Sequence, residues 1–307
     1  MSERLAKQAT QLARELGDRN SLCSLLINRH LVPRHVMSAR DIDARVIELD
    51  ELVKLSQDID NDELKQRAHS LDLYISAELG ERARMDRAVA AMGELGEGRQ
   101  RLLAKWIAHH GDAMRAILDG DFPAAEVLAR EGLELGRQTH GAQSEGVYGI
   151  QMFSIRREQG RLAEVAQVIK HLIEENPEGS TWLPGFALIA ADLGFEAPAR
   201  LRLREMAETG FDMPLDAKRS TSLSYLAEVA ALLGDTESAA RLYELMSVYR
   251  HMTITMGIAT VCYGAASRYL GMLATTLGEF DKAAAHFEHA LKMNGAMGAR
   301  AWLAHTK

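Results

Sequence analysis

The sequence predicts an all-α protein, a right-handed superhelical solenoid built from helical hairpins. Ala, Leu and Met contribute most of a 47% hydrophobic content and aromatic residues only 6%, which favours helices over sheets. Segments with helical periodicity end repeatedly at a glycine, and a second helical segment follows each of these glycines. Small residues recur after the glycines at positions that share one helix face. Together these observations predict hairpins that stack closely on one another.

The glycines that punctuate the helical segments recur at intervals of 34 to 44 residues. A helix-turn-helix repeat takes roughly 34 residues, so each interval accommodates one hairpin and a connecting loop of variable length. We therefore expect a stack of about seven hairpins. The predicted turn glycines are Gly80, Gly120, Gly160, Gly194, Gly234 and Gly278.

The clearest repeat spans residues 269–290 and resembles the tetratricopeptide consensus. It has a Leu-Gly pair ending at Gly271, a turn glycine, and then Ala283, Phe287 and Ala290. Residues at spacings of four and three share one helix face. We expect the two alanines to admit the neighbouring helix and Phe287 to fill the remaining gap.

The other repeats follow the same pattern less clearly. The units at Gly234 and Gly120 keep the small residues on both sides of the turn. Asp121 and Asp235 directly follow these two glycines, at the position where a carboxylate caps the next helix. Weaker copies surround Gly80, Gly160 and Gly194.

The N-terminal segment predicts divergent helical hairpins. Helical periodicity runs over residues 6–16, 21–31 and 41–57, with Asp-rich junctions between the helices. We expect one helical-repeat domain over residues 1–307, with divergent hairpins in 1–62 and clearer repeats in 63–307.

Charge and cysteine content exclude several classes of function. A net charge of −7 without a basic tail argues against direct nucleic-acid binding, since phosphates are neutralised by concentrated Lys and Arg. Cys23 and Cys262 lie far apart and lack partners at metal-ligand spacing, which favours a reduced, cytoplasmic setting without a metal or other cofactor. No apolar stretch reaches membrane-spanning length, so we expect no membrane partner.

Several short phrases, read in order, are similar to one family. They occupy residues 14–18, 28–30, 156–162, 269–271, 277–278, 286–288 and 298–304. This order resembles the tetratricopeptide-repeat C-terminal region of large bacterial signalling ATPases, namely LuxR-type regulators of the maltose-activator kind and ATPase-linked adenylate cyclases. The resemblance implies that the repeats sense an inducer or partner and relay it to the ATPase and output domains.

The departures from that family are equally informative. The sequence contains no phosphate-binding loop, cyclase-like region or DNA-reading helix-turn-helix signature. The chain also starts inside a hairpin and stops inside what looks like the first helix of another unit. We therefore expect a fragment of a larger regulator.

The concave groove is the predicted contact surface, because the first helix of each hairpin lines it in tetratricopeptide superhelices. Aligning the units on their turn glycines predicts a groove lined by Arg67, Tyr74, Glu78, His110, Met114, Ser154, Arg157, Glu158, Asp192, Ser224, Glu228, Arg268 and Thr275. Tyr148 is a further groove candidate. Such a mixed-charge surface suits a peptide, a helix or a small polar molecule, with Arg157 and Arg268 as carboxylate or phosphate clamps. The alternative is that these side chains are solvated or paired within the repeats.

The sequence favours a binding or sensor module that recognises a peptide, a protein partner or a small effector. One rival is an enzyme with a pocket near His110, Arg157 and Tyr148, but no sequence motif assigns a catalytic residue. His109 and His110 diverge by about 100° around a helix, so they cannot both face one ion. The second rival is a structural segment that forms a homo-oligomer through its terminal helices.

Overall fold

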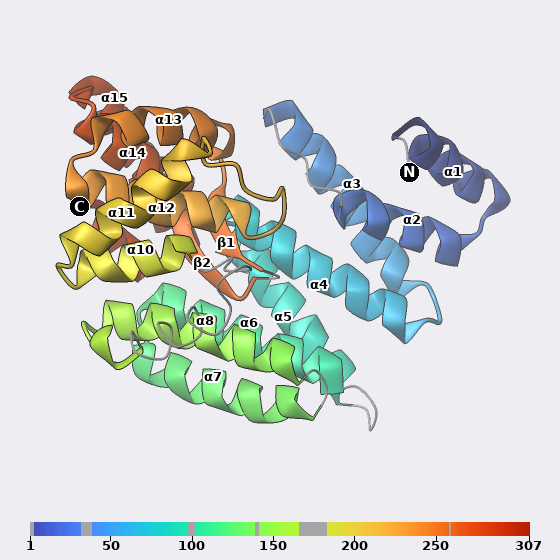
Figure 1. Cartoon of the computed structure of the whole chain (residues 1–307). Coiled ribbons are helices and arrows are strands. Elements are labelled where there is room, and N and C mark those ends of the chain that lie inside the picture. The colour runs from blue at the N-terminus through green and yellow to red at the C-terminus, as the bar shows by residue number, and fades with distance from the viewer. Residues whose placement is uncertain (1–2, 32–38, 98–101, 139–140, 166–182, 258) are drawn as a thin grey trace.

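A computed structural model of the chain describes residues 3–31, 39–97, 102–138, 141–165, 183–257 and 259–307 (Figure 1). Helices make up most of these residues, and the only strands among them form one antiparallel pair. The predicted all-α class is therefore confirmed at this level. None of the helices in the described ranges is both long enough and apolar enough to cross a membrane.

Three N-terminal helices form a stack with its own apolar core. They are α1 (Glu3–Leu16), α2 (Arg19–Leu31) and α3 (Ala39–Gln57), which match the three predicted helices. Leu26, Leu49 and Leu52 are fully buried in a cluster that these helices share with α4. The predicted change of repeat type at residue 62 stays a prediction.

The following helices pair in sequence order. They are α4 (Asp62–Leu79), α5 (Arg82–Gly96), α6 (Leu102–Asp119), α7 (Phe122–Arg137), α8 (Ala142–Glu158), α10 (Leu183–Asp192), α11 (Glu196–Glu208), α12 (Arg219–Leu233), α13 (Thr236–Met246), α14 (Ala266–Thr276), α15 (Phe280–Met297) and α16 (Arg300–Thr306), with a short 3-10 helix, η1 (Ser247–Tyr249), after α13. Pairs such as α4 with α5 and α6 with α7 pack directly against each other.

The predicted turns and caps are confirmed. All six predicted turn glycines have positive φ values, between 63° and 78°, a conformation that residues with a Cβ rarely adopt. The carboxylate of Asp121 accepts a hydrogen bond from the Ala124 amide at 3.1 Å, and that of Asp235 accepts one from the Ser238 amide at 3.0 Å. The repeat pattern therefore marks where these helices end and begin.

The clearest repeat packs as its small residues predict. Ala283 and Ala290 are buried on α15. A Cβ on Gly271 would lie 2.8 Å from the Phe287 ring, so only glycine permits this approach between α14 and α15.

A β-hairpin lies at the centre of the helices that follow α3, a feature that the sequence analysis missed. Its strands are β1 (Thr253–Met256) and β2 (Val261–Ala265), and every residue in both is buried. The hairpin contacts α4, α6, α8, α12, α14, α15 and α16 (Figure 1). Helices distant in sequence thus share one central element.

Side chains from the surrounding helices form hydrogen bonds with the backbone N–H and C=O groups of the hairpin. Gln151 donates to the Thr260 carbonyl at 3.1 Å, Thr221 donates to the Thr255 carbonyl at 3.0 Å, and the Asn294 side chain accepts from the Ala265 amide at 2.9 Å. Because buried backbone groups must find partners, these bonds fix the hairpin inside the protein.

The C-terminal helix α16 packs against elements that lie earlier in the sequence. It contacts strand β2 and also helix α6, which is far earlier in the sequence. Trp302 is 1% exposed, and its indole Nε1 donates to the Cys262 carbonyl at 2.8 Å. Helix α16 is thus packed within this chain, and the contact between terminal helices of two copies stays a prediction.

Candidate functional site

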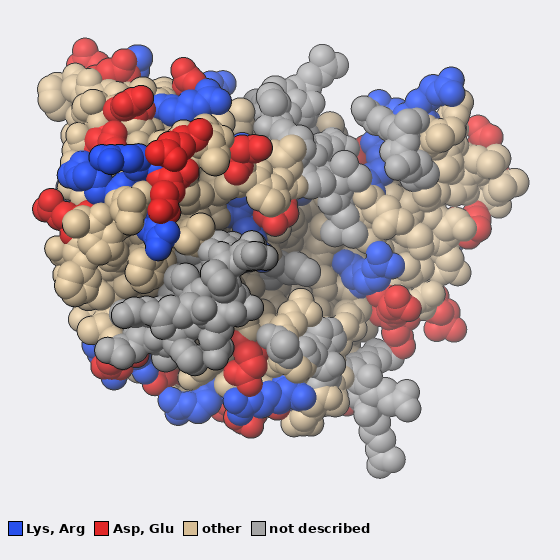
Figure 2. Space-filling view, in the orientation of Figure 1, with Lys and Arg blue, Asp and Glu red and all other residues tan. Residues whose placement is uncertain are grey.

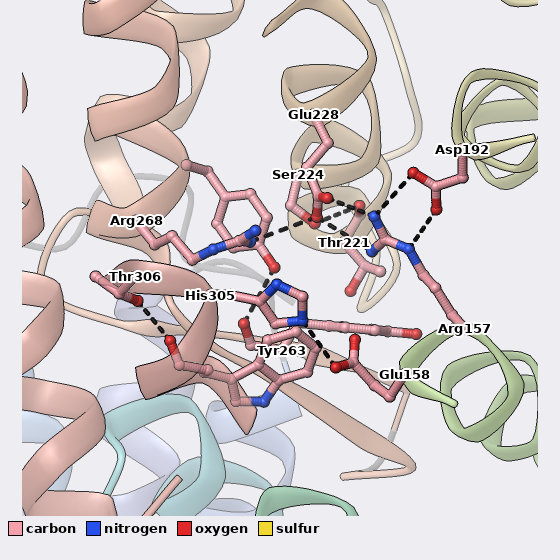
Figure 3. A network of polar contacts seen from close by, with 12 residues as sticks. Arg157, Glu158, Asp192, Thr221, Ser224, Glu228, Tyr263, Arg268, His305 and Thr306 are labelled. Carbon is pink, nitrogen blue, oxygen red and sulfur yellow. Dashed lines mark hydrogen bonds and ion pairs between the residues drawn. The ribbon is translucent and has the colours of Figure 1, made fainter. Parts of the chain in front are cut away.

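Charged side chains from α8, α10, α12, α14 and α16 meet in one polar network (Figure 3). Arg157 comes from α8, Asp192 from α10, Glu228 from α12, Arg268 from α14 and His305 from α16. Four of these five residues were predicted as groove residues from their positions relative to the turn glycines. The structure therefore brings together side chains separated by more than a hundred residues.

Arg157 is the hub of the network. Its Nε donates to Asp192 Oδ2 at 2.6 Å, and its Nη2 donates to Glu228 Oε2 at 2.5 Å. The side chain is only 14% exposed. Burial lowers the pKa of Arg157, but the two carboxylates more than offset this and hold the pKa well above its ordinary value. Arg157 is therefore a fully paired cation.

Glu228 is shared by two guanidinium groups. Its side chain is 5% exposed, and burial alone would raise the pKa of its carboxyl group. The charges of Arg157 and Arg268 prevail and lower this pKa to about 2. Glu228 therefore remains ionised at neutral pH, and its charge offsets part of the positive charge of both arginines.

Arg268 is the least satisfied charge in the network. Its side chain is 6% exposed, and its contact from Nη1 to Glu228 Oε1 is long, at 3.5 Å. The guanidinium lies over the Tyr269 ring, with Cζ 4.9 Å from the ring centroid. Its Nε has no hydrogen-bond partner among the described residues. A buried charged donor left in this state is costly unless a further acceptor completes it.

The opposite side of the network involves α8, the hairpin and α16. Glu158 contacts His305 Nε2 at 2.7 Å, and the His305 ring stacks on Trp302. The Tyr263 hydroxyl contacts Ser154 Oγ at 2.8 Å. Burial raises the pKa of Tyr263, so its hydroxyl stays protonated and can donate. The network thus offers both donors and acceptors.

Two predicted groove residues belong to a second cluster. The Tyr74 hydroxyl donates to Glu78 at 2.6 Å, and Glu78 pairs with Arg45 of α3 at 2.9 Å. Arg67 lies near Cys23 of α2, since its charge lowers the pKa of that thiol against the larger raising effect of burial. The structure therefore places these residues toward the N-terminal stack.

The remaining predicted residues serve the core or the surface. His110 is buried and packs edge-on against Trp106, with ring centroids 5.1 Å apart, and Met114 is fully buried. Tyr148 is half-buried and packs against the core. Ser224 is bonded to the Thr221 carbonyl, and Thr275 is exposed. Thus His110, Tyr148 and Arg157 lie in different sets of contacts.

The sequence analysis missed the residues that the hairpin and α16 bring to the network. These are Tyr263 of β2 and Trp302 and His305 of α16. Tyr225 of α12 was also not predicted, and its hydroxyl donates to that of Tyr263 at 2.5 Å. A signal existed in the β-branched residues around 253–261 and in Gly257, which has the positive φ of a turn.

Other site types find less support in the described part of the chain. No three His, Cys, Asp or Glu side chains there are placed to hold a metal ion. On the face in Figure 2, acidic and basic side chains are interspersed, so its visible described residues form no continuous basic track for nucleic-acid phosphates.

No protein-family model matches the chain, and no curated protein matches it. The functional argument therefore rests on the chemistry of the polar network.

Proposed function

We propose that this chain is a binding or sensor module of tetratricopeptide type, and that the polar network around Arg157, Glu228 and Arg268 recognises its ligand. The observation that carries the proposal is the incomplete pairing of Arg268. Its buried guanidinium has one long contact with Glu228 and an Nε without a partner in the described structure. A ligand that accepts hydrogen bonds would relieve this cost.

The filled interior favours a small polar effector over an extended peptide. The buried β-hairpin occupies the space inside the helices, and inner-face side chains such as Gln151 and Thr221 already bind its backbone. A long peptide would have to replace these contacts. A small molecule needs only the part of the inner face where the charged residues meet.

A sensor role agrees with the resemblance of the sequence to the repeat region of bacterial signalling ATPases. In such a role, ligand binding would bias the packing of α8, α10, α12, α14 and α16, because each helix contributes to the network. We propose a cytoplasmic setting and a larger regulator as the context.

A thermal-shift screen of small polar metabolites tests the proposal. Ligands should raise the melting temperature of the wild-type chain, and this shift should be lost in Arg157→Gln and Arg268→Gln. Arg156→Gln is the matched control, because Arg156 also lies on α8 and is a largely buried arginine, but it pairs with Glu126 at 2.6 Å outside the network.

Equal shifts of the melting temperature in all three variants would contradict the proposal. A screen in which no compound raises the melting temperature of the wild-type chain would also contradict it. Turnover of a compound that depends on His110 would favour an enzyme instead. If Arg157→Gln does not fold, Arg268→Lys provides the second test, since lysine keeps the charge but lacks the planar guanidinium.

A further inference from the structure

The guanidinium edge of Arg268 that carries Nε indicates one chemical class of ligand. Its Nη1 faces Glu228 at 3.5 Å, whereas its Nε, on another edge of the planar guanidinium, has no partner among the described residues. Two neighbouring guanidinium N–H groups match the two oxygens of a carboxylate, which they bind in parallel. The geometry therefore suits a planar acceptor better than a single hydroxyl.

The surrounding charges decide between a carboxylate and a phosphate. Asp192, Glu228 and Glu158 bring three negative charges to the network, against the two positive charges of Arg157 and Arg268. A doubly charged phosphate would meet strong repulsion from these carboxylates, and a single negative charge meets less. Arg157 is already paired on two sides, so it adds little binding capacity for a second anion.

We propose that the Nε edge of Arg268 binds a carboxylate group of the ligand. This inference rests on the proposed function and adds the ligand class. The Nε atom is covered in the present arrangement. Access requires a shift of a neighbouring group, and His305 is suited to this because its side chain is 41% exposed and lies in the same network.

Arginine Nε–Hε resonances in ¹⁵N-correlated NMR spectra report on this edge directly. We expect titration with sodium acetate to shift the Arg268 resonance in a saturable manner. The Arg157 resonance is an internal control, because its Nε is already bonded to Asp192 at 2.6 Å. Sodium chloride and sodium phosphate at equal ionic strength should give no saturable shift of Arg268.

Two variants sharpen the test. Arg268→Lys should remove the shifting resonance and assign it, and through-bond assignment of the wild-type spectrum serves if this variant does not fold. Asp192→Asn removes a nearby negative charge and should increase the affinity for acetate by about threefold.

A non-saturable shift of Arg268, a similar shift with all three salts, or an equal shift of Arg157 would overturn the carboxylate inference. A ligand without a carboxylate that still requires Arg157 and Arg268 in the thermal-shift screen would also overturn it, and the proposed function would stand. If the thermal-shift screen finds no ligand, both the proposed function and the carboxylate inference are contradicted.

Discussion

Two of the buried arginine networks among the described residues differ in how fully their guanidinium groups are paired. In the N-terminal part, Arg84 of α5 contacts Asp72 of α4 and also pairs with Asp50 of α3 at 2.6 Å. One guanidinium there has two carboxylates. Around the hairpin, two guanidiniums share Glu228, and Arg268 is left with a long contact. The first network links α3, α4 and α5, whereas the second leaves the Nε of Arg268 without a hydrogen-bond partner among the described residues.

The two regions also differ in what fills their centre. The N-terminal helices bury their own apolar side chains, such as Leu26 and Leu49, against one another. The later helices surround a buried β-hairpin instead. We therefore propose that recognition takes place at the polar network beside the hairpin and not along an open groove.

The largest expected effect is the loss of Glu228. Glu228→Gln leaves two buried guanidinium groups without their shared carboxylate, so the free energy of unfolding should fall by about 3–5 kcal/mol. Asp50→Asn in the other network should cost less than about 1 kcal/mol, because the Asp50 side chain is 63% exposed. Urea denaturation measures both values, and equal losses would contradict the distinction between the networks.

Acid should weaken the fold through the same carboxylate. The pKa of Glu228 is about 2 in the folded chain, below its ordinary value of 4.5, so the unfolded chain binds the proton first. The stabilisation is complete above about pH 4.5 and is lost as the pH falls toward 2, with a magnitude on the order of 3 kcal/mol. Unfolding measured against pH should show a shallower decline in Glu228→Gln. If the free energy of unfolding falls with pH as steeply in Glu228→Gln as in the wild-type chain, Glu228 is not the source of the acid sensitivity.

Alanine substitutions at two glycines test how closely the hairpin is packed compared with the N-terminal stack. Gly17 and Gly264 both have positive φ values, 66° and 74°, so alanine is strained at either position. A Cβ at Gly264 would lie 2.7 Å from Trp302 Cγ, whereas one at Gly17 meets nothing within 4 Å. Gly264→Ala should therefore destabilise the chain by about 2 kcal/mol more than Gly17→Ala. Equal melting temperatures would argue against close packing of α16 on the hairpin.

The smallest effect concerns the exposed ion pair of the N-terminal stack. Arg14 of α1 pairs with Glu51 of α3 at 2.6 Å, and both side chains are more than a third exposed. Arg14→Gln should lower the free energy of unfolding by only about 0.5 kcal/mol, and high salt should remove the difference. A loss as large as that of Glu228→Gln would erase the contrast between exposed and buried pairs.

The predictable part of the fold follows from local signals. Glycines at helix ends and Asp121 or Asp235 at helix starts act within a few residues, so their roles are readable from sequence. Alignment on these turns also placed Arg157, Asp192, Glu228 and Arg268 among the predicted groove residues, and the structure brings these four side chains into one network.

The unpredicted part depends on contacts between distant segments. The strands of the β-hairpin have four and five residues, and their burial depends on helices that span the chain from α4 to α16. His305 reaches the network only because Trp302 anchors α16 on the hairpin. Tyr74 and Glu78 of α4 lie in another cluster, in which Glu78 pairs with Arg45 of α3. Local periodicity contains no information on these pairings.

Native-state hydrogen exchange of the hairpin amides tests most directly whether the centre of the protein is filled. If the hairpin is a permanent part of the core, amides in 253–256 and 261–265 should exchange only through global unfolding, with the same opening free energy as core amides of α12. Hairpin amides that open several kcal/mol below this level, while α12 stays protected, would contradict the account, because the hairpin would then be a displaceable occupant of an inner groove.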